Sequence, residues 1–206
     1  MTRSLNVLII ESRRGAADAE TRALEAAGHR TTRCFDEADA VGFPCRAVVD
    51  PADCPLLDPP DVALVVRRHI ATHPRPLEQG ASCALRAGIP VVEAGPELLD
   101  PYGPWLTARL DADVVAGCEA AADSALAELR GRIMRLVDPT FAAAGVARDD
   151  VTCTIDTSGP DLNVHFALPV PVTTGVRQAL AVRVLDAVRG ARHTYGKVGV
   201  SVGVSP

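Results

Sequence analysis

Apolar and polar positions along the first 95 residues follow two alternating patterns. Short runs rich in Val, Ile and Leu are typical of buried strands, and Ala- and Leu-rich runs with one apolar side are typical of helices. The patterns predict helices at 16–28 and 76–88, both ending at a glycine, and strands at 5–10, 29–35, 61–66 and 89–95. Strands that alternate with helices in this way predict an α/β domain on a small doubly wound, mainly parallel sheet.

The second half of the chain has a different order of patterns. Residues 112–137 carry an apolar stripe at spacings of three and four, made of Val115, Cys118, Ala122, Leu126, Leu129, Ile133 and Leu136. Alternating residues then predict a hairpin at 151–168, followed by a helix at 173–189 and a strand at 197–204. The result is an α+β domain of order αββαβ, with two helices on one face of a three-stranded sheet. The other face stays open and polar, with Thr152, Thr154, Asn163, His165 and Ser201.

Between the two halves, residues 96–111 contain three prolines, a glycine and the single tryptophan. This composition is typical of a linker, because proline and glycine interrupt regular structure. We expect it to pack down through Tyr102 and Trp105. The predicted organisation is therefore an α/β domain at 1–95, a linker at 96–111 and an αββαβ domain at 112–206.

The composition of the chain argues against several classes of protein. The chain has 206 residues, 48% of them hydrophobic, and a net charge of −5 with scattered basic residues. That length is sufficient for two small cores, and no apolar run approaches the roughly 20 residues that span a bilayer. A negative chain without a basic patch argues against nucleic-acid binding, and the first residues lack the pattern of a secretory signal. We therefore expect a cytoplasmic protein whose six cysteines are reduced or bind metal.

The opening of the chain, LNVLIIES…AADAETRALEAAGHRTTRCF, resembles the opening of response-regulator receiver domains, which have a flavodoxin-like fold. The resemblance implies acidic Mg²⁺ ligands after the first strand, a phosphoacceptor Asp ending the third strand and a Lys ending the fifth. Glu11 is the acid that follows the first strand here, and Asp50, which ends the run RAVVD, is the candidate acceptor. The single lysine of the chain is Lys197, far outside this region.

Two hypotheses follow, depending on which run forms the third strand. If Asp50 ends the third strand, the domain is a phosphorylatable receiver. If residues 61–66 form the central strand instead, that strand ends at Arg67 and offers no acceptor. The domain is then a degenerate receiver within a non-catalytic regulatory or assembly protein, which is the hypothesis we favour.

The C-terminal segment 151–204 resembles the small domain of the alkaline-shock-protein family, in the layout DLNVHFALPVPVTTGVRQALAVRVLDAVRGARHTYGKVGVSVGV. The resemblance implies an envelope-stress or assembly role through protein contacts. The final run, KVGVSVGV, lacks internal charges and prolines, so as an edge strand it is a candidate for pairing with its symmetry mate in a twofold dimer. If it is the central strand instead, it offers no edge.

The cysteines of the first half suggest a second class of function. Cys34, Cys45, Cys54 and Cys83 could together hold zinc or an iron–sulfur cluster, because thiolates are preferred ligands of both. Their spacing contains no C-x-x-C pair, and the alternative is that they are small buried apolar residues. Cys118 and Cys153 fall within apolar stripes, and we interpret them as core residues.

Charged residues gather where the predicted parallel strands end. Arg67, Arg68 and His69 follow the strand at 61–66, and Glu11 follows the first strand. Ligands of open α/β sheets collect beyond the carboxyl ends of the strands, and arginine pairs suit phosphate or carboxylate groups. These four residues are the predicted ligand site, with a solvated charged loop as the alternative. The segment after the first strand matches neither a P-loop nor a dinucleotide-binding motif.

Overall fold

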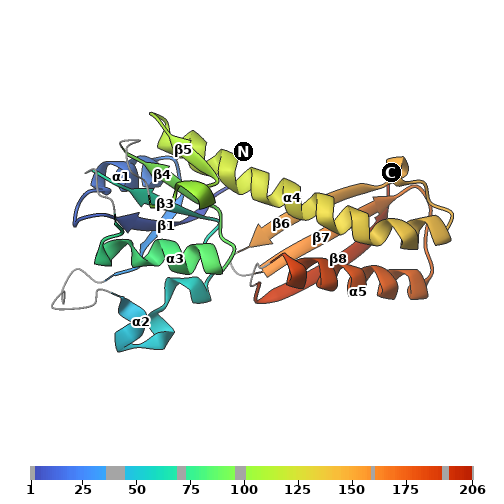
Figure 1. Cartoon of the computed structure of the whole chain (residues 1–206). Coiled ribbons are helices and arrows are strands. Elements are labelled where there is room, and N and C mark those ends of the chain that lie inside the picture. The colour runs from blue at the N-terminus through green and yellow to red at the C-terminus, as the bar shows by residue number, and fades with distance from the viewer. Residues whose placement is uncertain are drawn as a thin grey trace. The chain divides into compact units, whose positions relative to one another are not determined.

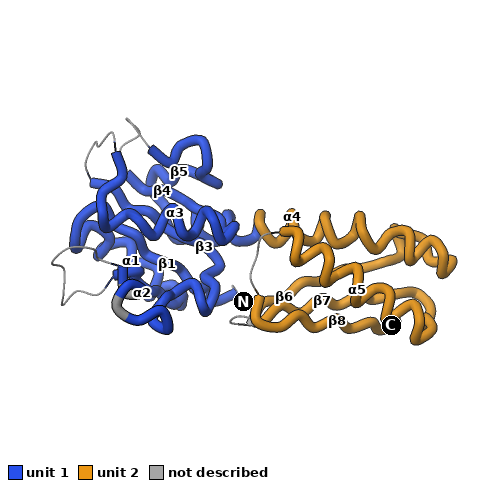
Figure 2. The backbone as a smooth tube through the Cα atoms, turned by 60° about the horizontal axis from the view of Figure 1, so that its bottom comes forward, with its two compact units in different colours: residues 1–123 blue, residues 124–206 orange. Residues whose placement is uncertain are grey.

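In the computed structural model the chain folds into two compact units, residues 1–123 and 124–206 (Figure 2). The structure describes residues 3–35, 45–68, 73–95, 101–158, 161–191 and 195–205, with only the backbone at Arg46, Val49 and Ser158. Within these described ranges, each unit contains its own buried hydrophobic residues, in two clusters in unit 1 and one cluster in unit 2.

Unit 1 is built on a parallel sheet of five strands in the order β2-β1-β3-β4-β5 (Figure 1). Every neighbouring pair in this sheet is parallel. The strands are β1 (Asn6–Glu11), β2 (Arg30–Arg33), β3 (Val62–Val66), β4 (Val91–Ala94) and β5 (Ala108–Leu110). All five residues of β3 are buried, as its continuous apolar run predicts for a central strand. This strand order is one of the two common doubly wound orders.

Helices cover both faces of this sheet. Helix α1 (Asp18–Ala26) and the first turns of α4 (Val114–Ala143) pack on one face through Leu24, Cys118 and Ala122. Helix α3 (Gln79–Arg86), preceded by the 3₁₀ helix η3 (Pro76–Glu78), packs on the other face. The predicted α/β class with a doubly wound parallel sheet is therefore confirmed.

The connection from β2 to β3 differs from the prediction. The run RAVV forms one helical turn, α2 (Arg46–Val49), followed by the 3₁₀ helices η1 (Pro51–Asp53) and η2 (Pro55–Leu57). Proline at the first position of each 3₁₀ helix favours a helical turn over a strand. Asp50 therefore follows a helix, and its carboxylate caps η1 by accepting the Ala52 N–H at 2.9 Å.

The predicted linker needs a correction. Its end forms β5, which pairs with β4, and Gly103–Trp105 form the 3₁₀ helix η4. Tyr102 is buried as expected, whereas Trp105 is 63% exposed. The division between the units falls within α4, after residue 123, because the first turns of this helix complete the core of unit 1.

Unit 2 contains a three-stranded sheet in the order β6-β7-β8. Strands β6 (Thr152–Ser158) and β7 (Asp161–Leu168) form the predicted antiparallel hairpin, and β8 (Lys197–Val204) runs parallel to β7. The 3₁₀ helix η5 (Arg148–Asp150) precedes the hairpin, and α5 (Thr174–Gly190) precedes β8. The predicted order αββαβ is confirmed, and β8 lies at an edge of the sheet and not in its centre.

The core of unit 2 lies on one face of its sheet. The remainder of α4 and helix α5 pack there against the buried side chains of β7, which include Phe166. Phe166 forms an edge-to-face pair with Phe141 of α4, with ring centroids 5.5 Å apart. The opposite face carries exposed polar side chains, as predicted, and His165 shares a hydrogen bond of 2.9 Å with Ser201. Among the described residues, no helix has the length and apolarity to cross a membrane.

Candidate functional site

The strand order of unit 1 puts its switch point between β1 and β3, where ligands of doubly wound sheets bind. Glu11 ends β1, and Arg67 and Arg68 follow β3, so three of the four predicted ligand residues lie at this edge. His69, the fourth, lies outside the described residues. The Ser12 N–H donates to the Val66 carbonyl at 3.0 Å and joins the two strand ends directly.

Glu11 is fully buried and serves the local fold. Its two carboxylate oxygens accept hydrogen bonds from the N–H groups of Gly15 and Ala17, each at 3.0 Å. Gly15 has a φ of 73°, which allows the loop to turn back over the carboxylate. Glu11 therefore holds the entry to α1, and this use competes with the metal-ligand role that the receiver resemblance implies.

Arg67 forms a buried ion pair at the end of the central strand. Its Nε donates to Oε1 of Glu78 at 2.9 Å, and the two side chains are 2% and 0% exposed. The other oxygen of Glu78 accepts the Arg75 N–H at 2.7 Å, so the carboxylate also holds the turn into α3. Gly95 approaches this pair closely, because a Cβ at Gly95 would lie 2.2 Å from the Arg67 carbonyl oxygen. The position that would carry the acceptor of a receiver is thus occupied by a packed arginine.

Arg68 ties the end of β3 to α1. Its guanidinium pairs with Glu20 and donates from Nε to the Ala16 carbonyl at 3.1 Å. Its backbone N–H donates to the Ser12 hydroxyl at 3.4 Å. The charged groups of Glu11, Arg67 and Arg68 therefore all have partners within the protein.

Asp50 does not end a strand of the sheet, as the receiver hypothesis requires. It is exposed, and it lies in the β2–β3 connection between α2 and η1. The prediction that it ends the third strand is wrong, since β3 begins at Val62. The alternative, a central strand ending at Arg67, describes the sheet correctly.

The four N-terminal cysteines come from separate elements on the α3 side of the sheet. Cys34, Cys45 and Cys83 line one small cavity of about 20 Å³, with Phe35, Leu77 and Gly80. Burial raises the pKa of Cys83, the nearby thiols of Cys45 and Cys54 raise it further, and Arg86 lowers it. Cys54 therefore lies near the other thiols as well.

These cysteines are not arranged as the ligands of a bound metal ion. The cavity offers room for about one water molecule. Within the described part of the chain, no group of three His, Cys, Asp or Glu side chains is placed to hold a metal ion. Cys118 and Cys153 are core residues, as expected, and burial raises the pKa of their thiols to about 12 and about 11.

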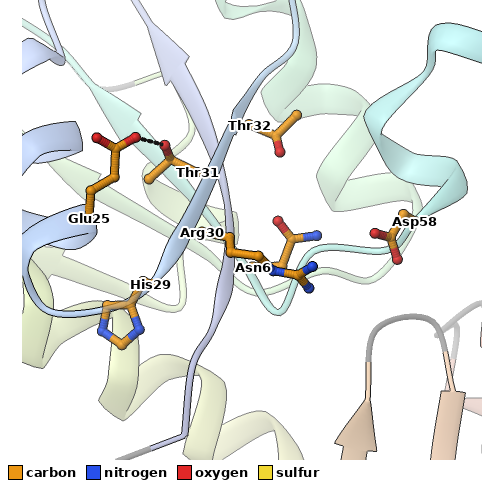
Figure 3. A pocket seen from close by; sticks show the side chains of 7 residues that line it. All are labelled: Asn6, Glu25, His29, Arg30, Thr31, Thr32 and Asp58. Carbon is orange, nitrogen blue, oxygen red and sulfur yellow. Dashed lines mark hydrogen bonds between the residues drawn. The ribbon is translucent and has the colours of Figure 1, made fainter.

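A polar pocket of about 410 Å³ lies at the amino ends of β1 and β2 (Figure 3). Its lining is Asn6, Glu25, His29, Arg30, Thr31, Thr32 and Asp58. One arginine faces two carboxylates there, and the Thr31 hydroxyl already donates to Glu25 at 2.6 Å. No sequence pattern indicates this pocket, because only the fold brings residues so distant in the chain together. It lies at the opposite end of the strands from the switch point.

His29, which lines this pocket, is itself a buried structural residue. Its Nδ1 accepts the Leu5 N–H at 3.2 Å, and its Nε2 lies 3.5 Å from Oε1 of Glu119 in α4. The ring therefore contacts both the start of β1 and helix α4.

Comparison of the chain with protein-family models, with curated proteins and with solved structures gave no match.

Proposed function

We propose that this protein is a non-catalytic regulatory or assembly protein. In this proposal unit 1 is a degenerate receiver-like scaffold and unit 2 is a protein-interaction domain. The observation that carries the proposal is the buried Arg67–Glu78 pair at the end of the central strand. A phosphoacceptor carboxylate would be needed at that place.

The chemistry of phosphoryl transfer supports the same conclusion. The reaction needs an accessible carboxylate, a metal held by oxygen ligands and a cation, all within one site. Glu11 is buried and accepts two backbone N–H groups, and Arg67 is buried against Glu78. Asp50 is exposed but lies on another connection of the fold. The groups are therefore not combined in one place.

Incubation of the purified protein with a small phosphodonor and Mg²⁺ tests the proposal. We expect intact mass spectrometry to show no added phosphoryl group. Asp50→Ala serves as the diagnostic variant and Asp53→Ala, in the same connection, as its matched control. A phosphoryl adduct that Asp50→Ala removes and Asp53→Ala retains would contradict the proposal and establish the phosphorylatable receiver.

The cysteine cavity favours one second candidate, a sensor that binds zinc or an iron–sulfur cluster. Three of the four cysteines line one cavity, and the Cys54 thiol contributes to raising the pKa of Cys83. A metal would have to draw the sulfur atoms to about 2.3 Å from itself, which requires α3 and the β2–β3 connection to shift.

Elemental analysis and an absorption spectrum of anaerobically purified protein distinguish this candidate. Under the main proposal we expect less than a tenth of a metal ion per chain. The matched variants are Cys83→Ser, at the cavity, and Cys153→Ser, in the core of unit 2. Stoichiometric zinc or an iron–sulfur chromophore that only Cys83→Ser removes would replace the main proposal with the sensor.

A further inference from the structure

Strand β8 presents an unprotected sheet edge. Among the described residues, β7 is its only strand neighbour. Residues 198–204 contain no proline and no charged side chain, the devices that commonly protect exposed edges. The other edge strand, β6, carries the charged Asp156 near its middle.

The hydrogen-bond pattern shows which backbone groups of β8 face outward. The Ser205 N–H donates to the Leu168 carbonyl at 2.7 Å, and Val204 is the register partner of Leu168. A parallel ladder uses alternate residues of each strand, so the odd-numbered residues of β8 bond to β7. The N–H and C=O groups of the even-numbered residues therefore point away from the sheet, at Val198, Val200, Val202 and Val204.

The side chains of these valines also lack full cover. They lie on the core face of the sheet, where the apolar side chains of β7 are fully buried. Val198, Val200 and Val202 are only partly buried, and Val204 is 54% exposed. A further strand beside β8 would satisfy the outward backbone groups and cover the valines at once.

We propose that the strand added beside β8 is β8 of a second copy, antiparallel and centred on Ser201. This inference rests on the proposed assembly function and names its partner. In this register Val200 pairs with Val202 of the second copy, and Val198 pairs with Val204. All four outward-facing residues of each copy then form hydrogen-bonded pairs, and their side chains form one continuous apolar ladder.

The other face of β8 suits this twofold arrangement. Ser201 lies opposite Ser201 of the partner subunit, and Gly199 lies opposite a glycine, so no bulky groups meet. Lys197, the charged residue of the strand, lies at the far end in each copy, so like charges stay apart. A register shifted by one residue would turn the valines of one copy away from the core face.

Substitution at Ser201 tests the register without disturbing the core, because this side chain is exposed on the polar face. We expect the full-length protein to sediment as a dimer at tens of micromolar. In Ser201→Lys two like charges face each other across the twofold axis, and the dissociation constant rises at least about tenfold. The matched control Thr154→Lys, on the same face but in β6, keeps the wild-type constant.

Two further measurements make the test specific. Ser201→Ala, which loses only the hydrogen bond to His165, remains dimeric, and a mixture of Ser201→Lys with Ser201→Asp recovers dimers. Amide exchange of Val200 and Val202 accelerates on dilution of the wild type. A monomeric wild type, or equal effects of Ser201→Lys and Thr154→Lys, overturns the inference. A monomer that accepts no phosphate refutes only the self-pairing, whereas a dimer phosphorylated on Asp50 refutes only the proposed function.

Discussion

Arg67→Met lowers the free energy of unfolding of unit 1 by about 3–5 kcal/mol, the typical cost of removing one partner of a buried ion pair. The substitution leaves the carboxylate of Glu78, which is 0% exposed, without its guanidinium. The loss extends to the turn before α3, because the same carboxylate holds the Arg75 N–H. Denaturant unfolding measures this loss of free energy, and amide exchange in β1 and β3 assigns it to unit 1.

Two variants control this result. Arg68→Met breaks a pair whose side chains are 39% and 11% exposed and removes the hydrogen bond to the Ala16 carbonyl, so we expect a smaller loss of about 1–2 kcal/mol. The double variant Arg67→Met/Glu78→Gln removes both charges, keeps a side-chain oxygen for the Arg75 N–H, and recovers most of the lost stability, because no unpaired charge stays buried. Equal losses for Arg67→Met and Arg68→Met would contradict the assignment of Arg67 as the structural charge of this edge.

Phe166→Ala removes the ring at the centre of unit 2 and lowers the stability of this unit by about 3–5 kcal/mol. Phe166 and its edge-to-face partner Phe141 are both fully buried, so the substitution leaves a cavity and a ring without its neighbour. We expect faster amide exchange throughout β7 and α5. The exposed Thr154→Ala, one strand away, changes stability by less than about 1 kcal/mol.

The two large predictions together test the division of the chain. Arg67→Met accelerates exchange in the strands of unit 1, and Phe166→Ala accelerates it in those of unit 2, because the two cores contain different residues. If either substitution accelerates exchange equally in β3 and β7, the two units unfold together and their cores are not independent in stability.

Patterns within single elements could be predicted from the sequence. The five-residue apolar run of β3 and the alternation in β6, β7 and β8 each reflect one strand's own burial, so the residues alone indicate them. The placement of β8 at an edge could not be predicted, because its alternation is the same in the centre of a sheet.

Features that depend on two elements were missed. Strand β5 has three half-buried residues, and only its pairing with β4 identifies it. The three prolines and the glycine that precede it in the segment 96–111 indicated a linker instead. The stripe of α4 continues unbroken from Cys118 to Ile133, although its two ends belong to different cores. Periodicity records that a face is buried and carries no information on what covers it.

The sequence predicted where the residues of the candidate site lie, but not which partners their charged groups bind. Glu11, Arg67 and Arg68 meet at the switch point because strand ends share an edge, which the order of elements implies. Their partners Glu20 and Glu78 lie in neighbouring helices, and which carboxylate reaches which arginine depends on packing. The convergence of Cys34, Cys45 and Cys83 depends in the same way on the path of the β2–β3 connection.

The sharing of α4 between two cores sets a condition on synthesis of the chain. One face of the unit 1 sheet is covered by Cys118, Ala121 and Ala122, which follow β5 in the sequence. A nascent chain that has emerged only to residue 111 therefore has all five strands, but α1 alone covers this face, and the part that α4 covers is still exposed. Domains generally fold from the N-terminus as they leave the ribosome, so unit 1 becomes complete only when the first turns of α4 have emerged. A pause in translation before the first turns of α4 have emerged would prolong the exposure of this apolar surface. A pause after they have emerged would not.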